Sequence, residues 1–247
     1  MVDAAILGGV NYFDTAYFYH GGGSETFLGE ALAKYPRHQY YLADKMPLHM
    51  LEKEGDVPRI FAEQLARCKT GYFDFYLCHA LSGDNYHKLE DYKVYSFLQQ
   101  QKREGRIRHI GFSFHDEPEV LAKACRQYEW EFAQIQLNPL DWEVYRSREQ
   151  YEVLAQRGIP CIVMEPVRGG RLADLGADAN ALLQAAAPGR SIASWSLRFA
   201  AGLPGVMTAL SGMRDLAQAK DNITIASSMQ PSSEEQPISL FAAPTIF

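Results

Sequence analysis

Short apolar runs alternate along this chain with longer stretches in which apolar residues recur every three or four positions. Short runs rich in β-branched and aromatic residues are typical of buried strands, and the longer period is typical of amphipathic helices. We predict strands at 12–16, 40–45, 73–79, 107–114, 132–138, 161–166 and 206–212. We predict helices at 24–34, 58–69, 89–104, 117–126, 147–156, 191–201 and 215–223.

The interiors of these strands are almost wholly apolar, which is typical of parallel strands covered on both faces. Strands that alternate with helices form a parallel sheet with right-handed crossovers. The length of 247 residues suits one barrel domain, since such barrels have about 250 residues. We therefore predict an α/β fold, a TIM (β/α)8-type barrel that is incomplete, with about seven of the eight strand–helix units.

The two ends of the chain depart from this alternation. Residues 1–9 (MVDAAILGG) indicate the last turns of a helix that ends at a glycine. In a barrel of this type such a helix should follow a strand, so we expect the first barrel strand to be missing upstream of Met1. After Ile225 there are three prolines and five serines without a clear period. The predicted domains are a barrel at 1–225 and an irregular C-terminal tail at 226–247.

Composition narrows the classes of partner. The formal net charge is -6, from 24 Lys and Arg against 30 Asp and Glu, whereas nucleic-acid binding needs a basic surplus. No apolar run approaches the roughly 20 residues that span a bilayer, and residues 1–10 lack the basic start of a signal peptide. We expect a cytoplasmic protein that binds a small molecule, without nucleic acid or membrane partners. Its cysteines lie far apart among apolar neighbours, which favours free thiols over disulfides or a metal site: Cys68, Cys78, Cys125 and Cys161.

Polar residues gather where the predicted strands end. The carboxyl ends of barrel strands meet at one mouth, where active sites are built. One polar residue at a strand end has no significance, but polar residues at the ends of seven successive strands form a pattern. They are Asp14, Lys45, His79, Ser113, Gln134, Asn138, Glu165 and Ser211.

Four residues near the first three strand ends suit the reduction of a carbonyl. Tyr19 can donate a proton if a nearby cation lowers its pKa from about 10. Lys45 can supply that cation, Asp14 can hold Lys45, and His79 can hydrogen-bond the same oxygen. Each residue alone is more typical of a cap, an ion pair or the core. The four together, on three successive strand ends, favour an active site.

The motifs that contain these residues resemble those of the aldo-keto reductase family. FDTAYFYHGGGSE resembles its first signature, ADKMP its lysine segment and DFYLCHAL its histidine segment. GFSFHD, AQIQLN and LSGMRDLAQAKDN resemble its cofactor-binding segments, and the resemblance runs from about Gly9 to Ile225. It implies a barrel that transfers a hydride between NAD(P)H and a carbonyl or alcohol. The implied catalytic residues are Asp14, Tyr19, Lys45 and His79.

The resemblance also implies a cofactor site. Its nicotinamide carboxamide contacts fall on Ser113 and Gln134, and Met164 occupies the position that stacks on the ring. Its adenine-end contacts fall on Ser211, Gly212, Met213, Arg214, Gln218 and Asn222. The helix after Ser211 offers backbone N–H groups to phosphate.

The sequence departs from the family pattern at several of these positions. Members that use NADP carry Lys and Arg where this chain has Gly212 and Gln218, so NADP and NAD both stay open. Phe114 replaces the usual Asn, and Met164 the usual aromatic ring. The chain resembles a bacterial branch that often ends in a cysteine-rich iron–sulfur segment. No cysteine follows Cys161, so we expect no iron–sulfur cluster.

Two functions remain open from the sequence. The first is an NAD(P)H-dependent oxidoreductase that reduces an aldehyde or ketone to an alcohol, with Tyr19 as general acid. The alternative is a catalytically inactive truncated barrel fragment, or a cofactor-binding or sensing module. The alternative follows from the missing strand, which would leave two open sheet edges.

Overall fold

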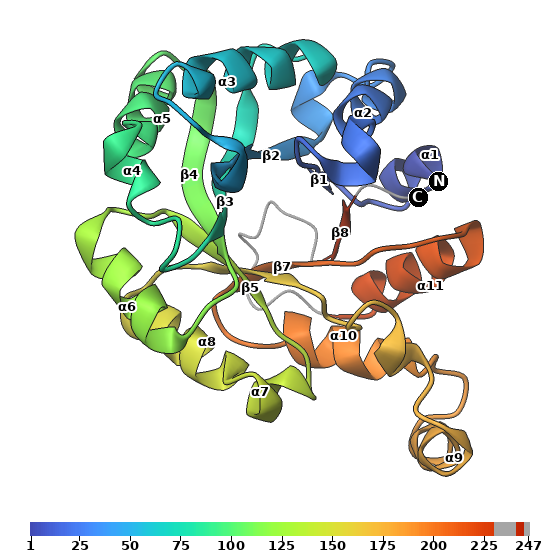
Figure 1. Ribbon diagram of the computed structural model, residues 1–247. Coiled ribbons are helices and arrows are strands. Elements are labelled where there is room, and N and C mark those ends of the chain that lie inside the picture. Colours follow the sequence, from blue (N-terminus) through green and yellow to red (C-terminus); the bar gives the residue numbers. More distant parts are fainter. Residues whose placement is uncertain (230–240, 245–247) are drawn as a thin grey trace.

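The computed structural model describes residues 1–229 and 241–244, and it shows a closed barrel of parallel strands surrounded by helices (Figure 1). The predicted (β/α) barrel is therefore confirmed, and the seven predicted strands are its first seven. The strands are β1 Tyr12–Asp14, β2 Tyr41–Pro47, β3 Phe73–Leu81, β4 Ile107–Phe114, β5 Phe132–Gln136, β6 Cys161–Met164, β7 Val206–Leu210 and β8 Phe241–Pro244.

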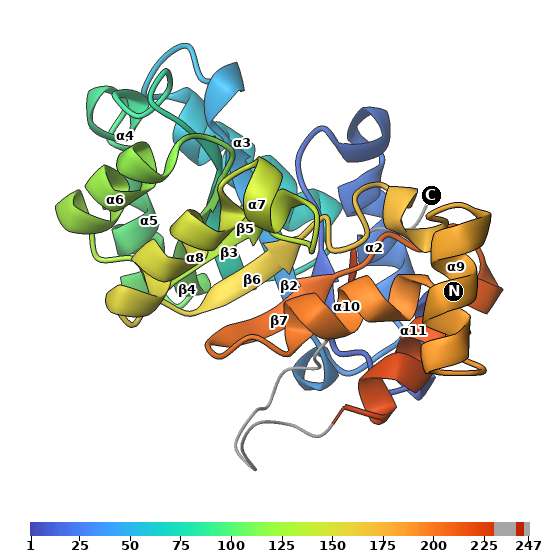
Figure 2. The ribbon, with the colours of Figure 1, turned by 90° about the horizontal axis from the view of Figure 1, so that it is seen from below.

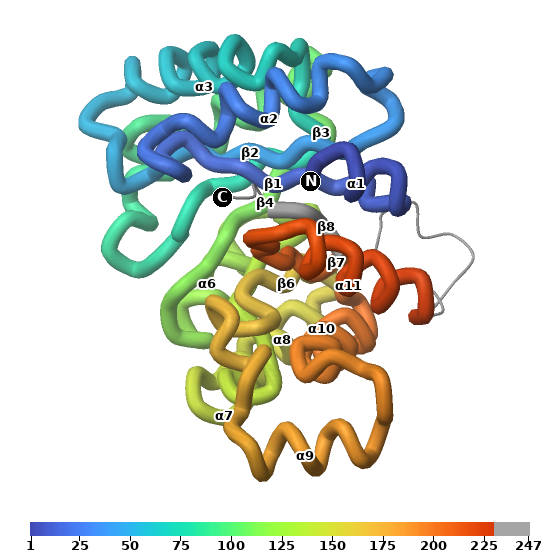
Figure 3. The backbone as a smooth tube through the Cα atoms, turned by 90° about the vertical axis from the view of Figure 1, so that its right-hand side faces the viewer, coloured from blue at the N-terminus to red at the C-terminus, as the bar shows by residue number. Residues whose placement is uncertain are grey.

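Helices connect the strands along the outside of the ring. The α-helices are α1 Val2–Leu7, α2 Ser24–Leu32, α3 Asp56–Arg67, α4 Lys88–Asp91, α5 Val94–Arg103, α6 Pro118–Gln127, α7 Asp141–Val144, α8 Ser147–Gln156, α9 Ala177–Ala186, α10 Ala193–Ala201 and α11 Leu216–Ser227. The 3-10 helices are η1 Tyr19–Gly22, η2 Arg37–Gln39, η3 Leu48–Met50 and η4 Arg171–Ala173. Figure 2 shows α10 running along β7, and Figure 3 shows α9 projecting from the body.

The predicted helices differ from the observed ones in two respects. The predicted helix 89–104 is two helices, α4 and α5, because Lys93 between them has a left-handed backbone with φ 53°. Two observed helices were not predicted, α7 and α9. The four residues of α7 are too few to show a period, and α9 consists largely of alanine and buries no residue in the fold.

An eighth strand, which the sequence did not predict, closes the ring. β8 pairs in parallel with β7 (Ala209 with Phe241) and with β1 (Phe13 with Ala243). It belongs to the segment 226–247 that was expected to be irregular. The edges of β7 and β1 would otherwise expose unpaired N–H and C=O groups, and β8 supplies partners for both. The open edges expected from a missing strand are therefore filled; residues 230–240 and 245–247 lie outside the described part.

Apolar side chains fill the barrel and the layer between strands and helices. Phe75 of β3 contacts Tyr12 of β1 and Phe132 of β5, each with ring centroids 5.1 Å apart. None of these strands is the neighbour of another, so the three rings meet across the interior of the barrel. A larger cluster joins the outer strand faces to the helices. This packing fixes which strand residues face the interior and which face the helices.

Candidate active site

Two of the predicted residues form a buried ion pair at adjacent strand ends. Asp14 is the last residue of β1, and Lys45 lies on β2 beside it. The Lys45 ammonium donates to Asp14 Oδ1 over 2.5 Å and to the Thr15 carbonyl oxygen over 2.7 Å. Lys45 is fully buried and Asp14 is 1% exposed. The two partners therefore hold the ammonium in one position.

Tyr19 lies beside this ammonium. It begins η1, the turn that follows β1, and Lys45 Nζ lies 4.9 Å from the centre of its ring. An ammonium has three hydrogens and no acceptor, and Asp14 and Thr15 take two of those of Lys45. The positive charge of Lys45 is therefore held in a fixed position next to the Tyr19 phenol.

The pKa of Tyr19 differs from the sequence expectation. Burial raises the pKa of Tyr19 above its usual value of 10.0, and the charge of Lys45 opposes this without reversing it. The expectation that Lys45 would bring the pKa below 10 is therefore wrong for this form of the protein. The sequence shows the cation but not how far the phenol is removed from water, which disfavours its charged form.

The ion pair keeps its charges in spite of burial. Burial lowers the pKa of Lys45, but Asp14 and other negative neighbours outweigh it, so the net shift is upward. Burial raises the pKa of Asp14, and Lys45 opposes that rise. The raised pKa of Lys45 favours its charged ammonium form beside the Asp14 carboxylate.

His79 lies on β3, and its ring contacts that of Tyr19. Its ring is 5.6 Å from the Tyr19 ring, at 82°. Burial, and then the charge of Lys45, lower the pKa of His79 to about 2, so the imidazole is neutral. A neutral imidazole has one N–H donor and one acceptor nitrogen. The strand is irregular here, because the β3–β4 register shifts after Cys78 and Ala80 has φ 51°.

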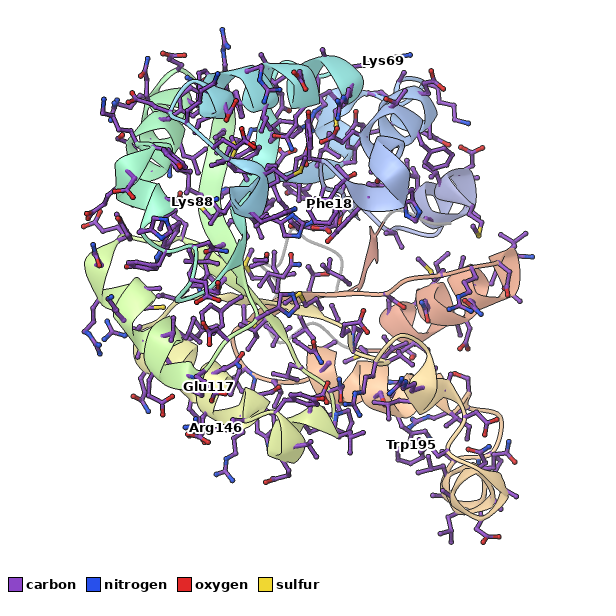
Figure 4. The ribbon with its side chains drawn as sticks, viewed as in Figure 1. Phe18, Lys69, Lys88, Glu117, Arg146 and Trp195 are labelled. Atoms are coloured by element: carbon purple, nitrogen blue, oxygen red, sulfur yellow. The ribbon has the colours of Figure 1, made fainter. Side chains whose placement is uncertain are left out.

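An aromatic side chain that the sequence did not single out borders the site. Phe18 stacks on His79 with ring centroids 4.9 Å apart and an angle of 10°. It also meets His49, which follows β2, edge-on at 5.0 Å. Phe18 is 39% exposed and lies over the interior of the ring, whereas Glu117 and Arg146 lie outside (Figure 4). The signal for Phe18 was its place directly before Tyr19, within the segment that resembles the first signature.

Three of the predicted cofactor residues lie in a row across neighbouring strands. Ser113 of β4 pairs in register with Gln134 of β5, and the Gln134 amide donates to the Met164 sulfur of β6 over 3.5 Å. All three are buried. Gln134 Oε1 has no hydrogen-bond partner within residues 1–229 and 241–244. A buried acceptor of this kind fits a ligand amide N–H.

The other predicted cofactor residues gather at the start of α11. Asn222 donates to Ser211 Oγ over 2.7 Å, which ties the end of β7 to the helix, and Met213 is buried. The exposed residues there are Gly212, Arg214 and Gln218. Gln218 Oε1 accepts from the backbone N–H of Arg214, and Asp215 caps the helix by accepting from the backbone N–H of Gln218.

The remaining predictions concern the other strand ends, the cysteines and membrane spans. Asn138 donates to the Glu165 carbonyl oxygen over 3.0 Å, so these two strand-end residues join loops to each other. The four cysteines are free and buried. Within the described residues, no group of His, Cys, Asp and Glu is placed to hold a metal ion. Over the same ranges, no helix has the length and apolar character to cross a membrane.

Comparisons with known proteins agree with this fold. The uncharacterized oxidoreductase YqkF of Bacillus subtilis is 26% identical over 265 residues, covering 95% of this chain and 84% of that protein. The holo form of aldo-keto reductase AKR11C1 from Bacillus halodurans has a TM-score of 0.75 at 24% identity, covering 95% of this chain and 82% of that one. An aldo-keto reductase from Klebsiella pneumoniae, solved in complex with NADPH, has a TM-score of 0.75 at 21% identity, with 94% and 79% covered.

The match to a family model decides the assignment. The model described as the aldo/keto reductase family matches residues 1–237, nearly the whole chain, including all the strands from β1 to β7. The chain therefore belongs to the aldo/keto reductase family of oxidoreductases.

Proposed function

We propose that this protein reduces an aldehyde or ketone to an alcohol with a nicotinamide cofactor, and that Tyr19 is the proton donor. One observation carries the proposal. The Lys45 ammonium is held by Asp14 and the Thr15 carbonyl oxygen and lies 4.9 Å from the centre of the Tyr19 ring, so a fixed positive charge stands beside the phenol that would donate the proton. A general acid held in this way contributes about 10²–10⁴-fold to a rate.

Each residue of the set has one role in this reaction. Tyr19 donates its proton to the carbonyl oxygen as negative charge develops there, and Lys45 stabilises the tyrosinate that results. Asp14 keeps Lys45 charged and oriented. His79 is neutral and donates a single hydrogen bond to the same oxygen. An imidazolium would instead compete with Tyr19 as the acid, so the low pKa of His79 favours Tyr19 as the proton donor.

The cofactor site is supported by groups whose partners a nicotinamide would supply. The unpartnered Gln134 Oε1 fits the amide N–H of a carboxamide, Ser113 lies beside it, and Met164 offers an apolar surface to the ring. A structural neighbour from Klebsiella pneumoniae was solved in complex with NADPH. When bound, the cofactor supplies the hydride, which is chemistry that no side chain provides.

The residues at the start of α11 favour neither NADPH nor NADH strongly. Arg214 is the cation at this helix start, while Gly212 and Gln218 carry no charge. The Asp215 carboxylate beside them would repel a phosphate group. We therefore propose that the protein accepts NADH as well as NADPH. The net charge of -6 further favours a small-molecule substrate over a nucleic acid.

The test is turnover with a matched pair of tyrosine variants. Oxidation of NADH or NADPH is followed by absorbance with a panel of aldehydes and ketones. Tyr19→Phe should reduce kcat by about 10²–10⁴-fold and leave cofactor binding nearly intact. Tyr17→Phe is the control, because the Tyr17 hydroxyl bonds Glu63 of α3 instead. Normal rates in Tyr19→Phe would refute the proposal.

A further inference from the structure

Lys45 of β2 lies beyond the point where the neighbouring strand β1 ends. The last β1–β2 backbone bond runs from Thr15 N–H to the Ala43 carbonyl oxygen, over 3.0 Å. Residues two apart in a strand direct their backbone groups to the same side. The N–H and C=O of Lys45 therefore point to the β1 side, where β1 has ended at Asp14. They need other partners because Lys45 is fully buried.

Two side chains take the place of β1 there. Asp44 Oδ1 accepts from the Lys45 N–H over 2.8 Å, and Gln64 Nε2 of α3 donates to the Lys45 carbonyl oxygen over 2.9 Å. Gln64 also donates to Asp44 Oδ1 over 2.9 Å, and its own carbonyl oxygen accepts from the Tyr76 hydroxyl of β3. Asp44, Gln64 and Tyr76 are all fully buried. These bonds fix the amide of Gln64 in one orientation. We call the two side chains that bond the Lys45 backbone, Asp44 and Gln64, the bracket.

A second carboxyl group shares this buried space. Glu25 of α2 is fully buried, and Gln64 Nε2 lies 3.1 Å from its Oε1 and 2.9 Å from Asp44 Oδ1, so one amide group lies against both carboxyl groups. Arg67 of α3 pairs with Glu25 over 2.9 Å. A charge on Glu25 opposes a second negative charge on Asp44.

The surroundings of Asp44 favour its neutral form. Burial, followed by the charge of Glu25, raises the pKa of Asp44 well above its usual value. The titratable groups that face it are Glu25 from α2, Cys68 from α3, Tyr76 from β3 and Lys45 on its own strand. Of these, only Lys45 is a cation, and its ammonium is already bonded to Asp14. An ionised Asp44 would raise the pKa of Tyr19, so the neutral form serves the reaction.

We propose that Asp44 and Gln64 are positioning residues that hold Lys45 by its backbone and so place the ammonium against Tyr19. The inference rests on the proposed roles of Lys45 and Tyr19. It assigns a role to a carboxyl pair on the helix side of the sheet that touches neither substrate nor cofactor. Loss of the bracket should let Lys45 move away from Tyr19, and the pKa of Tyr19 should rise.

The test measures the pKa of Tyr19 directly, in the full chain without substrate or cofactor. NMR of carbon-labelled tyrosine is recorded against pH, and Tyr19→Phe identifies the resonance. The variants are Asp44→Ala, which removes the bracket, and Asp44→Asn, which is neutral and keeps both bonds. Asp74→Ala is the matched control: Asp74 is also buried and accepts from a β2 backbone N–H, that of Leu42, three residues before Lys45.

The expected result is a rise of about one unit in the pKa of Tyr19 for Asp44→Ala, since an opposite charge within reach shifts a pKa by about one to three units. Asp44→Asn and Asp74→Ala should leave it unchanged. In turnover, kcat should fall about tenfold in Asp44→Ala with little change in KM, and Asp44→Asn should restore it. If Asp44→Ala does not fold, Gln64→Met removes the other bond at similar volume and should raise the pKa likewise.

Two results would overturn the proposal. An unchanged pKa of Tyr19 in Asp44→Ala and in Gln64→Met would show that the bracket does not position Lys45. A changed pKa of Tyr19 in Asp44→Asn, which keeps both bonds, would show that the charge of Asp44 and not its hydrogen bonds acts on Tyr19. Failure of the proposed reductase function is a separate result, because it would appear as absent turnover in the wild type while the NMR titration still reports on Lys45.

Discussion

Replacing Asp14 with asparagine tests the buried ion pair most sharply. Asparagine has nearly the same shape and can still accept a hydrogen bond from Lys45, so the change removes charge and little else. The Lys45 ammonium would remain fully buried, 2.5 Å from a neutral group in place of a carboxylate. Removing one partner of a buried pair is costly because the other charge is left without compensation.

The size of the effect follows from the burial of Lys45. Leaving one charge of a buried pair alone costs about 3–5 kcal/mol. A separate route gives a similar figure: burial lowers the pKa of an unpaired lysine by about three units, and each unit corresponds to about 1.4 kcal/mol. We expect Asp14→Asn to lose about 4 kcal/mol of unfolding free energy at pH 7. The loss should shrink to about 1 kcal/mol near pH 10, where the unfolded lysine also gives up its proton.

The sign of this pH dependence separates the wild type from the variant. In the wild type the pKa of Lys45 is raised, so its stabilisation is present at neutral pH and is lost as pH rises through that raised value. In Asp14→Asn the folded pKa is lowered instead, so the unfolded state binds more protons and stability rises with pH. The two stability curves should therefore converge on going from pH 7 to pH 10.

Urea unfolding followed by tryptophan fluorescence measures this difference. Glu54→Gln is the control, because the Lys93–Glu54 pair has a similar separation of 2.9 Å but is exposed. That variant should change the unfolding free energy by less than about 1 kcal/mol, with little dependence on pH. A loss below about 1 kcal/mol in Asp14→Asn at pH 7, or a loss that does not shrink with pH, would refute the reasoning.

Three further predictions concern the histidine, the last strand and the cofactor. The imidazole of His79 should show no NMR titration between about pH 9 and pH 4, because its pKa is about 2; a midpoint near 6.5 would mean that the ring is hydrated. Deleting residues 241–247 should reopen the edges of β7 and β1, lower the unfolding free energy and cause self-association in size-exclusion chromatography; an unchanged elution volume would contradict this. Gln218→Arg should tighten NADPH binding about tenfold in a fluorescence titration and leave NADH unchanged, since a charge-assisted bond contributes about 1.5–3 kcal/mol; equal effects on both cofactors would place the 2′-phosphate elsewhere.

The sequence predicts the barrel well because its strands are short apolar runs bounded by helices of clear period. The strand at 107–114 was predicted with its observed bounds. β8 was missed for a physical reason: its four residues lie in a segment without periodicity, and they form a strand only because β7 and β1 both lack a partner there. Strand formation of this kind depends on distant segments, which a local pattern does not show.

In the candidate site too, the sequence predicts some of the residues and misses others. The sequence suggests Asp14, Tyr19, Lys45 and His79 by their places at strand ends, and the structure brings them together. The sequence did not single out Asp44, although it stands next to Lys45. The reason is that the partners of Asp44 come from α2, α3 and β3, so both its burial and the rise in its pKa depend on the assembled fold. The direction of the Tyr19 shift was missed for the same reason.

The most direct test of the central claim is a single turnover with a cofactor that carries deuterium at the transferred position of the nicotinamide. Wild-type protein, cofactor and an aldehyde are mixed, and the alcohol is analysed by mass spectrometry. We expect deuterium on the carbinol carbon with the wild type, and about 10²–10⁴-fold slower transfer with Tyr19→Phe at full cofactor occupancy. No transfer by the folded wild type, or equal transfer by both proteins, would contradict the assignment of Tyr19 as the proton donor of a reductase.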